Sequence, residues 1–442
     1  MKEINWTIFL YCSGLSDSLS LIKFPLFGTT EIKISDFIFF LPVICIVRNW
    51  KFINRAIRST RKKGGFLFYS FSAFYVFLAL GIVLGIVRGN PIGLVLGDAR
   101  GVLFILIGFL SAFIIYYRID IFATKKLISF SLVVFIALPI QMFILRDNIV
   151  LFNFHQDAYT NFQDGYGRYI LPVTGVVFIS ITTTLLFKIF KSKRKRLFNI
   201  TLIPLFLITI WGSQSKSLII VLLILLLIVF IVWIYQKMKM VFYFVAATAI
   251  VIMGYFFFLP HNNSNEDLVS VSGRELPGLD FFVDPESYQS SLPEAYDRYD
   301  QYVDACDYIT QNSVSILGGG AGVIYRTPTW NYLESAVNKK DNYLTFSDSL
   351  TPYIIVKQGF LGLFTQLVYM AIIFACSIRL ISRSFAKLNE HTLIIALLGV
   401  SWFFLISFVN PVYTNDMGYF LGLFPTLTVL LGRKNPIQLN GQ

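Results

Sequence analysis

The chain has 442 residues, of which 56% are hydrophobic and 14% charged, and its mean hydropathy is +0.67. This leaves too little polar surface to cover a soluble globule, and apolar runs of about 20 residues recur along the chain. The net charge of +12 comes from basic residues gathered between the apolar runs, which argues against a nucleic-acid-binding groove. The composition therefore indicates a multi-pass helical membrane protein.

Apolar runs long enough to cross a bilayer predict an all-α membrane protein with about twelve transmembrane helices. The first run lacks a small-residue cleavage site and leads directly into another span, so we expect a retained helix rather than a signal peptide. The predicted helices are 4–22, 32–47, 65–87, 99–117, 127–145, 170–188, 197–212, 217–235, 240–259, 353–378, 392–409 and 417–432.

The connections between these helices alternate in charge, and the alternation predicts their orientation. Seven Lys/Arg in 48–63 and six in 188–196 assign both segments to the cytoplasm by the positive-inside rule. Both termini are then cytoplasmic as well. Segments 116–126, 236–240 and 379–387 follow the same phase. The opposite, extracytoplasmic face is expected to carry 88–100, 146–169, 212–216, 260–348 and 410–416.

The segment 260–348 differs from the rest of the chain in charge. It holds 14 Asp/Glu and 5 Lys/Arg, a net of −9, whereas the remainder holds 11 Asp/Glu and 32 Lys/Arg, a net of +21. We therefore predict three parts: helices one to nine in 1–259, a large extracytoplasmic loop in 260–352, and the last three helices with a cytoplasmic C-terminus in 353–442.

Within this loop, EAYDRYDQYVDACDYITQ predicts an amphipathic helix packed against the membrane mouth. Its apolar face is expected to carry Ala295, Tyr299, Tyr302, Cys306 and Ile309. Aromatic faces stack on sugar rings and carboxylates bind hydroxyls, so an acidic, tyrosine-rich loop suits a glycan. An ordinary solvated loop is the open alternative.

The glycine run in ILGGGAGVIYR, residues 316–326, has two interpretations. Backbone N–H groups of such a run can cradle a phosphate, but the Lys-Ser/Thr ending of a P-loop is absent. We therefore expect a tight turn that lets the loop pack closely on the membrane helices.

Permanent cations gather near the predicted outer ends of the helices. An ionisable group inside a span is costly and indicates function by default, with snorkelling to the interface as the alternative. Such a cluster suits a lipid pyrophosphate, because guanidinium forks match phosphate oxygens and neutralise a leaving group. The cations are Arg88, Arg100, Arg146, Arg168, Lys216, Arg274, Arg298, Arg326 and Lys357.

The sequence offers no metal or cofactor pattern. His155, His261 and His391 stand apart, without an HExxH or DxD motif or a cysteine partner, so we expect neither a metal nor another cofactor.

Four motifs in the second half occur in an order that resembles the bacterial O-antigen polymerase and O-antigen ligase superfamily. They are GSQSKSL at 212–218, the segment from Arg298 to Ala305, the glycine run at 318–322, and SDSLTPYIIVKQGFLGL at 347–363. The resemblance covers the whole chain in topology and the second half in motifs.

One departure from the ligases concerns the element H-N-x-Y-L-x(6)-G-L-x-G. Eleven residues before Gly359 this sequence has Asp348 instead of histidine, which favours a polymerase. Lys216 stands in the turn that often reads Ser-Arg in ligases, so the position remains cationic.

The resemblance implies a GT-C-like fold and glycosyl transfer at the outer face of the bacterial inner membrane. An undecaprenyl-pyrophosphate-linked oligosaccharide would be transferred to a hydroxyl of a second lipid-linked repeat unit, without a metal. Partners would be this lipid-linked glycan, the bilayer, a chain-length regulator and a flippase. A ligase and a polysaccharide transporter remain alternatives.

The resemblance also implies roles for particular residues. Asp348 would be the base or the orienter of the acceptor hydroxyl, with helix capping as the alternative. Arg298 would share the catalytic role. Contacts to pyrophosphate or glycan would come from Arg100, Arg168, Lys216, Arg326, Lys357, Tyr299 and Trp330.

Overall fold

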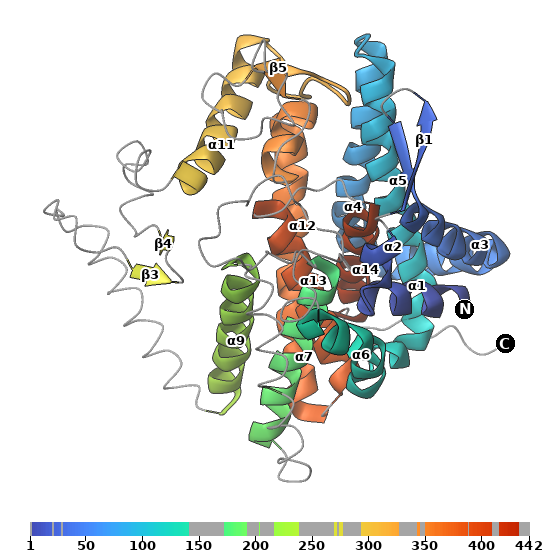
Figure 1. The fold of residues 1–442 in the computed structure, drawn as a ribbon, viewed down its shortest axis with the longest axis vertical. Helices are drawn as coiled ribbons and strands as arrows, with labels where there is room; N and C mark the ends of the chain where they lie inside the picture. Colours follow the sequence, from blue (N-terminus) through green and yellow to red (C-terminus); the bar gives the residue numbers. More distant parts are fainter. Residues whose placement is uncertain are drawn as a thin grey trace, which may run out of the picture.

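The computed structural model describes residues 2–19, 22–27, 30–140, 172–191, 203, 216–237, 269–271, 274–276, 293–326, 343–344, 350–387, 389–408 and 415–432. These residues are nearly all helical (Figure 1), with three short antiparallel strand pairs, β1–β2, β3–β4 and β5–β6. The mostly helical fold is thus confirmed, and the strand pairs are an addition to the all-α prediction.

The elements follow one another along the chain as follows. They are α1 (Lys2–Cys12), α2 (Leu15–Leu19), β1 (Lys23–Phe27), β2 (Thr30–Lys33), η1 (Ile34–Phe39), α3 (Phe40–Arg48), α4 (Trp50–Val87), α5 (Ile92–Ile115), η2 (Tyr116–Phe122), α6 (Thr124–Ile140), α7 (Pro172–Lys191), α9 (Lys216–Lys237), β3 (Val269–Val271), β4 (Arg274–Leu276), α11 (Pro293–Gln311), β5 (Tyr325–Arg326), β6 (Tyr343–Leu344), α12 (Leu350–Lys387), α13 (Glu390–Phe408) and α14 (Asn415–Gly432).

Three helical stretches among the described residues are long and apolar enough to cross a membrane: Phe68–Val87, Ile92–Phe122 and Leu350–Ser384. A bent pair, Phe37–Arg48 with Trp50–Lys62, raises the number to four if it forms one span. Shorter apolar helices lie at four of the other predicted positions: Gly175–Lys188, Val221–Gln236, Glu390–Trp402 and Gly418–Gly432. The predicted helices 197–212 and 240–259 lie outside the described residues, apart from residue 203, and the count of twelve stays a prediction.

Several predicted boundaries are wrong. The helix expected over 32–47 is preceded by β2 and η1, and the helix expected from residue 99 already begins at Ile92. The helix expected over 4–22 ends at Cys12, because Gly14 adopts a left-handed φ of 68°, a conformation that commonly ends helices. A short helix and the β1–β2 hairpin follow. The basic segment 48–63, expected as a loop, is instead helical from Trp50 and forms the first turns of α4.

The centre of the molecule is a close crossing of α5 and α14. On α14, Gly418 and Gly422 form a GxxxG spacing, which lets two helix backbones approach each other in a membrane. A Cβ atom on Gly422 would lie 1.9 Å from the carbonyl oxygen of Ile105, and one on Gly108 would lie 1.9 Å from that of Tyr419. Only glycine fits at these two positions, so this crossing fixes α5 in the bundle.

A buried polar cluster joins α4, α12 and α14 beside this crossing. The hydroxyl oxygens of Tyr75 and Tyr369 are 2.5 Å apart, and Tyr75 also lies 2.9 Å from Thr426 Oγ1. Each hydroxyl is thereby satisfied inside an otherwise apolar core. The cluster holds α12 and α4 in register.

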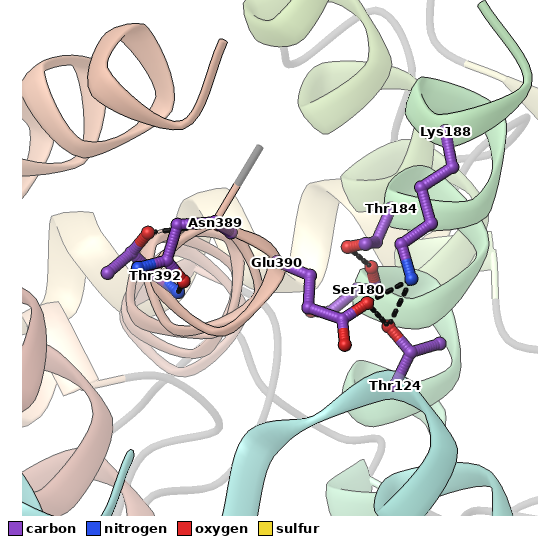
Figure 2. Close-up of polar contacts among 7 residues, drawn as sticks. All are labelled: Thr124, Ser180, Thr184, Lys188, Asn389, Glu390 and Thr392. Carbon is purple, nitrogen blue, oxygen red and sulfur yellow. Dashed lines mark hydrogen bonds and ion pairs between the residues drawn. The ribbon is translucent and has the colours of Figure 1, made fainter. Parts of the chain in front are cut away.

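Several connections that the charge pattern assigned to the cytoplasmic side contact one another at one end of the molecule. Figure 2 shows Glu390 of α13 accepting hydrogen bonds from Lys188 of α7 and from Thr124 of α6, the latter at 3.0 Å. Gln236 donates to the carbonyl of Ser382 at 2.9 Å, and Arg379 donates to that of Gly432 at 2.9 Å. The segments predicted to share the cytoplasmic phase therefore contact one another.

The Lys188–Glu390 pair also accounts for the protonation state of Glu390. Partial burial alone would raise the pKa of this carboxyl, but the hydrogen bond and charge of Lys188 outweigh it and lower the pKa below the ordinary value. The glutamate therefore stays ionised and pins α13 to α7.

Candidate functional site

The glycine run at 318–322 inserts into the hydrogen-bond ladder of α12 at a break. Gly359 has a φ of 65° and interrupts the helix. The N–H groups of Phe360 and Leu361 bond the carbonyls of Ser315 and Ile316 at 2.8 and 3.2 Å, rather than the carbonyls one turn earlier, as a regular helix requires.

Those earlier carbonyls are taken up by the glycine run. Val356 and Lys357 accept from the N–H groups of Gly319 and Gly320, at 2.7 and 2.9 Å. These two carbonyls and the N–H groups of Phe360 and Leu361 are therefore satisfied by the loop, as buried backbone requires. The loop is a structural part of the helix, and the predicted tight turn against the membrane helices is confirmed.

The opposite side of the run rests on the end of α4. Ala321 donates its N–H to the carbonyl of Gly81 at 2.8 Å. A Cβ atom on Gly85 would lie 2.2 Å from the carbonyl oxygen of Ala321, so this helix face must be bare. Gly320 has a φ of 82° and sits against the backbone of Gly85. Glycine is required on both surfaces of the contact.

Polar side chains from the turn after α4 complete the clamp. Asn90 donates through Nδ2 to the carbonyls of Gly319 and Ala321, at 3.0 and 2.8 Å. The Arg88 guanidinium donates to the carbonyl of Gly318. Three carbonyls of the run, those of Gly318, Gly319 and Ala321, thus accept hydrogen bonds from side chains. The run is therefore held by α12 on one side and by the end of α4 with its following turn on the other.

An ion pair lies beneath the loop. The Lys357 ammonium is 2.6 Å from Asp98 Oδ2, and the two side chains are only 2% and 13% exposed. The same carboxylate oxygen accepts from the N–H of Gly322 at 2.5 Å. The Lys357 ammonium also lies 4.9 Å from the centre of the Tyr353 ring. Asp98 therefore joins α5, α12 and the glycine run at one point.

Helix α11 packs on the same half of α12. Ala305 and Ile309 are buried in a small core with Val323, Tyr325 and Val356, separate from the main core. Figure 1 shows α11 lying beside the upper part of α12 at the end of the molecule that also carries β5. The predicted helix is confirmed as Pro293–Gln311.

The predicted apolar face of α11 is only partly correct. Tyr302, Cys306 and Ile309 pack toward the small core, but Tyr299 is exposed. The buried side also includes three polar residues, Asp300, Gln301 and Asp304. A simple count of apolar residues cannot find such a face, because charged side chains are assigned to water by default.

The Tyr308 side chain adds a proton donor to this region. Its ring centre is 5.9 Å from that of Tyr325. Burial raises the pKa of the Tyr308 hydroxyl, while the charge of Arg88 acts in the opposite direction. The hydroxyl stays protonated at neutral pH and close to the glycine run.

The structure brings together only some of the residues proposed from the sequence. Lys357 is at the centre of the clamp, and Tyr299 lies on the exposed side of α11. Arg100 follows Asp98 on α5, half-buried, with its guanidinium 6.0 Å from the centre of the Phe104 ring. Its cation thus contacts an aromatic ring on its own helix.

The remaining proposed residues fall at or beyond the edge of the described structure. The backbone places Lys216 at the start of α9, Arg298 in α11 and Arg326 at the end of β5, while their side chains are outside the description. Asp348, Arg168 and Trp330 lie wholly outside the described residues.

Sequence reasoning missed Asp98 as the partner of Lys357. The signal was present: Asp98 is the one Asp or Glu between Phe37 and Ile119, and Lys357 is the one Lys or Arg between Leu350 and Ile378. Isolated opposite charges in two apolar helices favour a mutual contact. The hydrogen bonds from Arg88 and Asn90 to backbone carbonyls of the glycine run could not be predicted in this way, because no residue pattern marks them.

These features define a helical membrane protein with apolar spans. In it, the glycine run fills a break in α12, and the Lys357–Asp98 ion pair is buried beside that run. Residues 200–367 match a family model described as O-Antigen ligase. This match supports the resemblance of the chain to the O-antigen polymerase and ligase superfamily over that stretch. No curated protein matches the chain. The matched stretch includes Lys357 and the glycine run but not Asp98.

Proposed function

We propose that the protein polymerises oligosaccharide repeat units carried on polyprenyl pyrophosphate. One lipid-linked glycan donates its reducing-end sugar to a hydroxyl on the non-reducing sugar of a second lipid-linked unit. The sugar–phosphate bond breaks, the new glycosidic bond forms, and the acceptor proton leaves with a base. The family match over residues 200–367 carries the proposal, because members of this family act on lipid-linked glycans in membranes.

The roles of the charged residues follow from the needs of this transfer. Cations near the mouth stabilise the departing pyrophosphate, which charge-assisted hydrogen bonds do without a metal. We assign this role to Arg100, Arg168, Lys216, Arg298 and Arg326, and base or orienting chemistry to Asp348. Tyr299 and Trp330 offer faces for sugar rings. Lys357, buried against Asp98, holds the backbone of the site in place.

A polymerase is favoured over a ligase by a single position. The ligase element has a histidine where this chain has Asp348, so the acceptor side of the site has different proton chemistry. A transporter is less favoured because the long segment 260–348 interrupts the two-fold internal repetition typical of transporters.

Lipid-linked glycan profiles separate these functions. In cells lacking the protein, we expect single repeat units without long polymer, since no step joins the units. Loss of a ligase would instead leave finished polymer on the polyprenyl carrier, and loss of an exporter would leave repeat units on the cytoplasmic face. Either of these two profiles contradicts the proposal. Re-expression of the wild-type chain is the control.

We further propose that the catalytic face lies outside the inner membrane. The acidic segment 260–348 and the basic segments 48–63 and 188–196 lead to this orientation. Single cysteines introduced at Asn312 and Lys125, both exposed, test it in a background without the four native cysteines. A membrane-impermeant thiol reagent should label position 312 in intact spheroplasts, and position 125 only after permeabilisation. The reverse pattern contradicts the orientation.

A further inference from the structure

The first turns of α4 carry a stripe of cations. Lys51, Arg55, Arg58 and Lys62 are all exposed, and their spacing of four, three and four residues places them on one face of a helix. The opposite face is buried, with Ile53 and Ala56 in the main core. This part of the helix is therefore packed on one side and presents a continuous positive face on the other.

The part of the chain that the structure describes supplies no opposite charge for this stripe. No Asp or Glu occurs between Phe37 and Gly97. Among the residues that the structure describes, the nearby Arg48 pairs with Glu3 at 2.7 Å, and none of the four stripe cations is in an ion pair. Four exposed like charges at helical spacing repel one another, so an anionic partner would relieve a cost built into the fold.

An exposed apolar stripe leads directly into the cations. Phe37, Phe40, Ile44 and Val47 are exposed at helical spacing along η1 and α3. Trp50 follows, 52% exposed, at the junction. The two helical segments, Phe37–Arg48 and Trp50–Lys62, meet at an angle of 75°. An apolar face, a tryptophan and a basic face therefore succeed one another across a bend.

This order matches the layers of a bilayer. Apolar side chains contact acyl chains, tryptophan prefers the interface, and Lys and Arg contact anionic headgroups. The length of α4 agrees, since 38 residues correspond to about 57 Å of helix, against about 30 Å of hydrocarbon core. Its span, Phe68–Val87, leaves the cationic turns outside the hydrocarbon core.

We propose that the stripe of Lys51, Arg55, Arg58 and Lys62 binds the headgroups of anionic phospholipids in the surrounding bilayer. An acidic protein would satisfy the cations but not the adjoining apolar stripe on α3, whereas a phospholipid satisfies both. The attraction is electrostatic and amounts to about fivefold in affinity for each cation near the surface.

The test uses the purified full chain and two lipids with identical acyl chains, phosphatidylglycerol and phosphatidylcholine. Native mass spectrometry should show that the wild type retains phosphatidylglycerol preferentially. Replacing all four cations by Gln should reduce this preference by at least about tenfold. A matched variant that exchanges Lys for Arg and Arg for Lys at the same four positions should keep it, because charge rather than fork geometry is used.

Three results overturn the proposal. One is an unchanged phosphatidylglycerol preference in the folded Gln variant. Another is displacement of phosphatidylglycerol from the wild type by polyglutamate at a lower charge concentration than by phosphatidylglycerol vesicles, which would indicate an acidic protein. If the Gln variant fails to fold, the salt dependence of the wild type is the test. Retention of phosphatidylglycerol must fall as the Debye length shrinks from about 10 Å at 0.1 M to about 3 Å at 1 M salt. Retention that stays constant over this range contradicts the proposal.

Discussion

An Asp98→Asn variant is expected to lose most of its folded population. Lys357 is 2% exposed and its ammonium lies 2.6 Å from the Asp98 carboxylate. The substitution removes the counter-charge of a buried cation, a change that typically costs about 3–5 kcal/mol. Asn keeps an acceptor for the N–H of Gly322. The loss of stability is therefore due to the missing negative charge and not to a missing contact with the loop. Yield of monodisperse protein and thermal unfolding in detergent measure it.

The double variant Asp98→Asn with Lys357→Met should recover much of this loss. Both charges are then absent, and replacement of a buried pair by neutral groups of similar volume is often close to neutral. A coupling energy well above 1 kcal/mol in the double-mutant cycle would identify the pair as the anchor of the loop. Additive losses in the two single variants would contradict it.

The matched control is Asp120→Asn. Asp120 pairs with Lys126 at 2.6 Å, but both side chains are about half exposed, 55% and 49%. The same chemical change at an exposed pair should cost no more than about 1 kcal/mol. A similar loss in both variants would show that the measurement responds to charge in general rather than to the buried pair.

The double variant also separates two roles for Lys357. If the lysine only positions the glycine run, polymer formation returns together with the fold. If it contacts the pyrophosphate, as the sequence suggested, folding returns without polymer. We expect polymer to return, because the ammonium is enclosed by Asp98, Tyr353 and the loop.

Helix positions were largely predictable from the sequence, since a run of about 20 apolar residues has few alternatives in a membrane. The errors arise where a local conformation overrides composition. Gly14 ends the first helix early, and the basic residues after Trp50 stay helical because Ile53 and Ala56 pack inward. Hydropathy alone cannot detect either effect.

The candidate site was predictable in its parts but not in its connections. The glycine run and Lys357 were identified from residue type. The break at Gly359 was not, because a glycine inside an apolar helix is compatible with an unbroken span. At this break, α12 forms hydrogen bonds with the segment around Gly319 instead of within itself. These bonds depend on the backbone conformation at two places 40 residues apart, Gly319 and Gly359. The residue types between them do not indicate that the two places meet.

Asp348→Asn is expected to abolish long polymer while leaving the protein folded in the membrane. Helix α12 begins at Leu350, and its next two turns are fixed by the glycine run and by Asp98. A carboxylate two residues before this start is therefore attached to a firmly held helix end. As a base or an ionic orienter of the acceptor hydroxyl it must be charged, and Asn keeps its shape but not its charge.

Helix capping makes the opposite prediction for the same variant. Asn and Ser cap helices about as well as Asp, so Asp348→Asn and Asp348→Ser would cost at most about 1 kcal/mol and spare the polymer. In the sequence, Ser349 directly precedes Leu350 and Asp348 is one position further away. Ser349→Ala is thus the control for a lost cap, and Asp341→Asn is the control for a lost charge in the same acidic segment.

Lipid-linked glycan profiles and expression levels of these variants decide between the two roles. We expect Asp348→Asn and Asp348→Ser to accumulate single lipid-linked repeat units at normal expression, and both controls to make polymer of wild-type length. Removing a proton acceptor typically lowers the rate by about 10² to 10⁴, so even the weaker loss leaves units unjoined. Wild-type polymer lengths in Asp348→Asn would return this residue to a structural role and move the search for the base to the other carboxylates of the 260–348 segment.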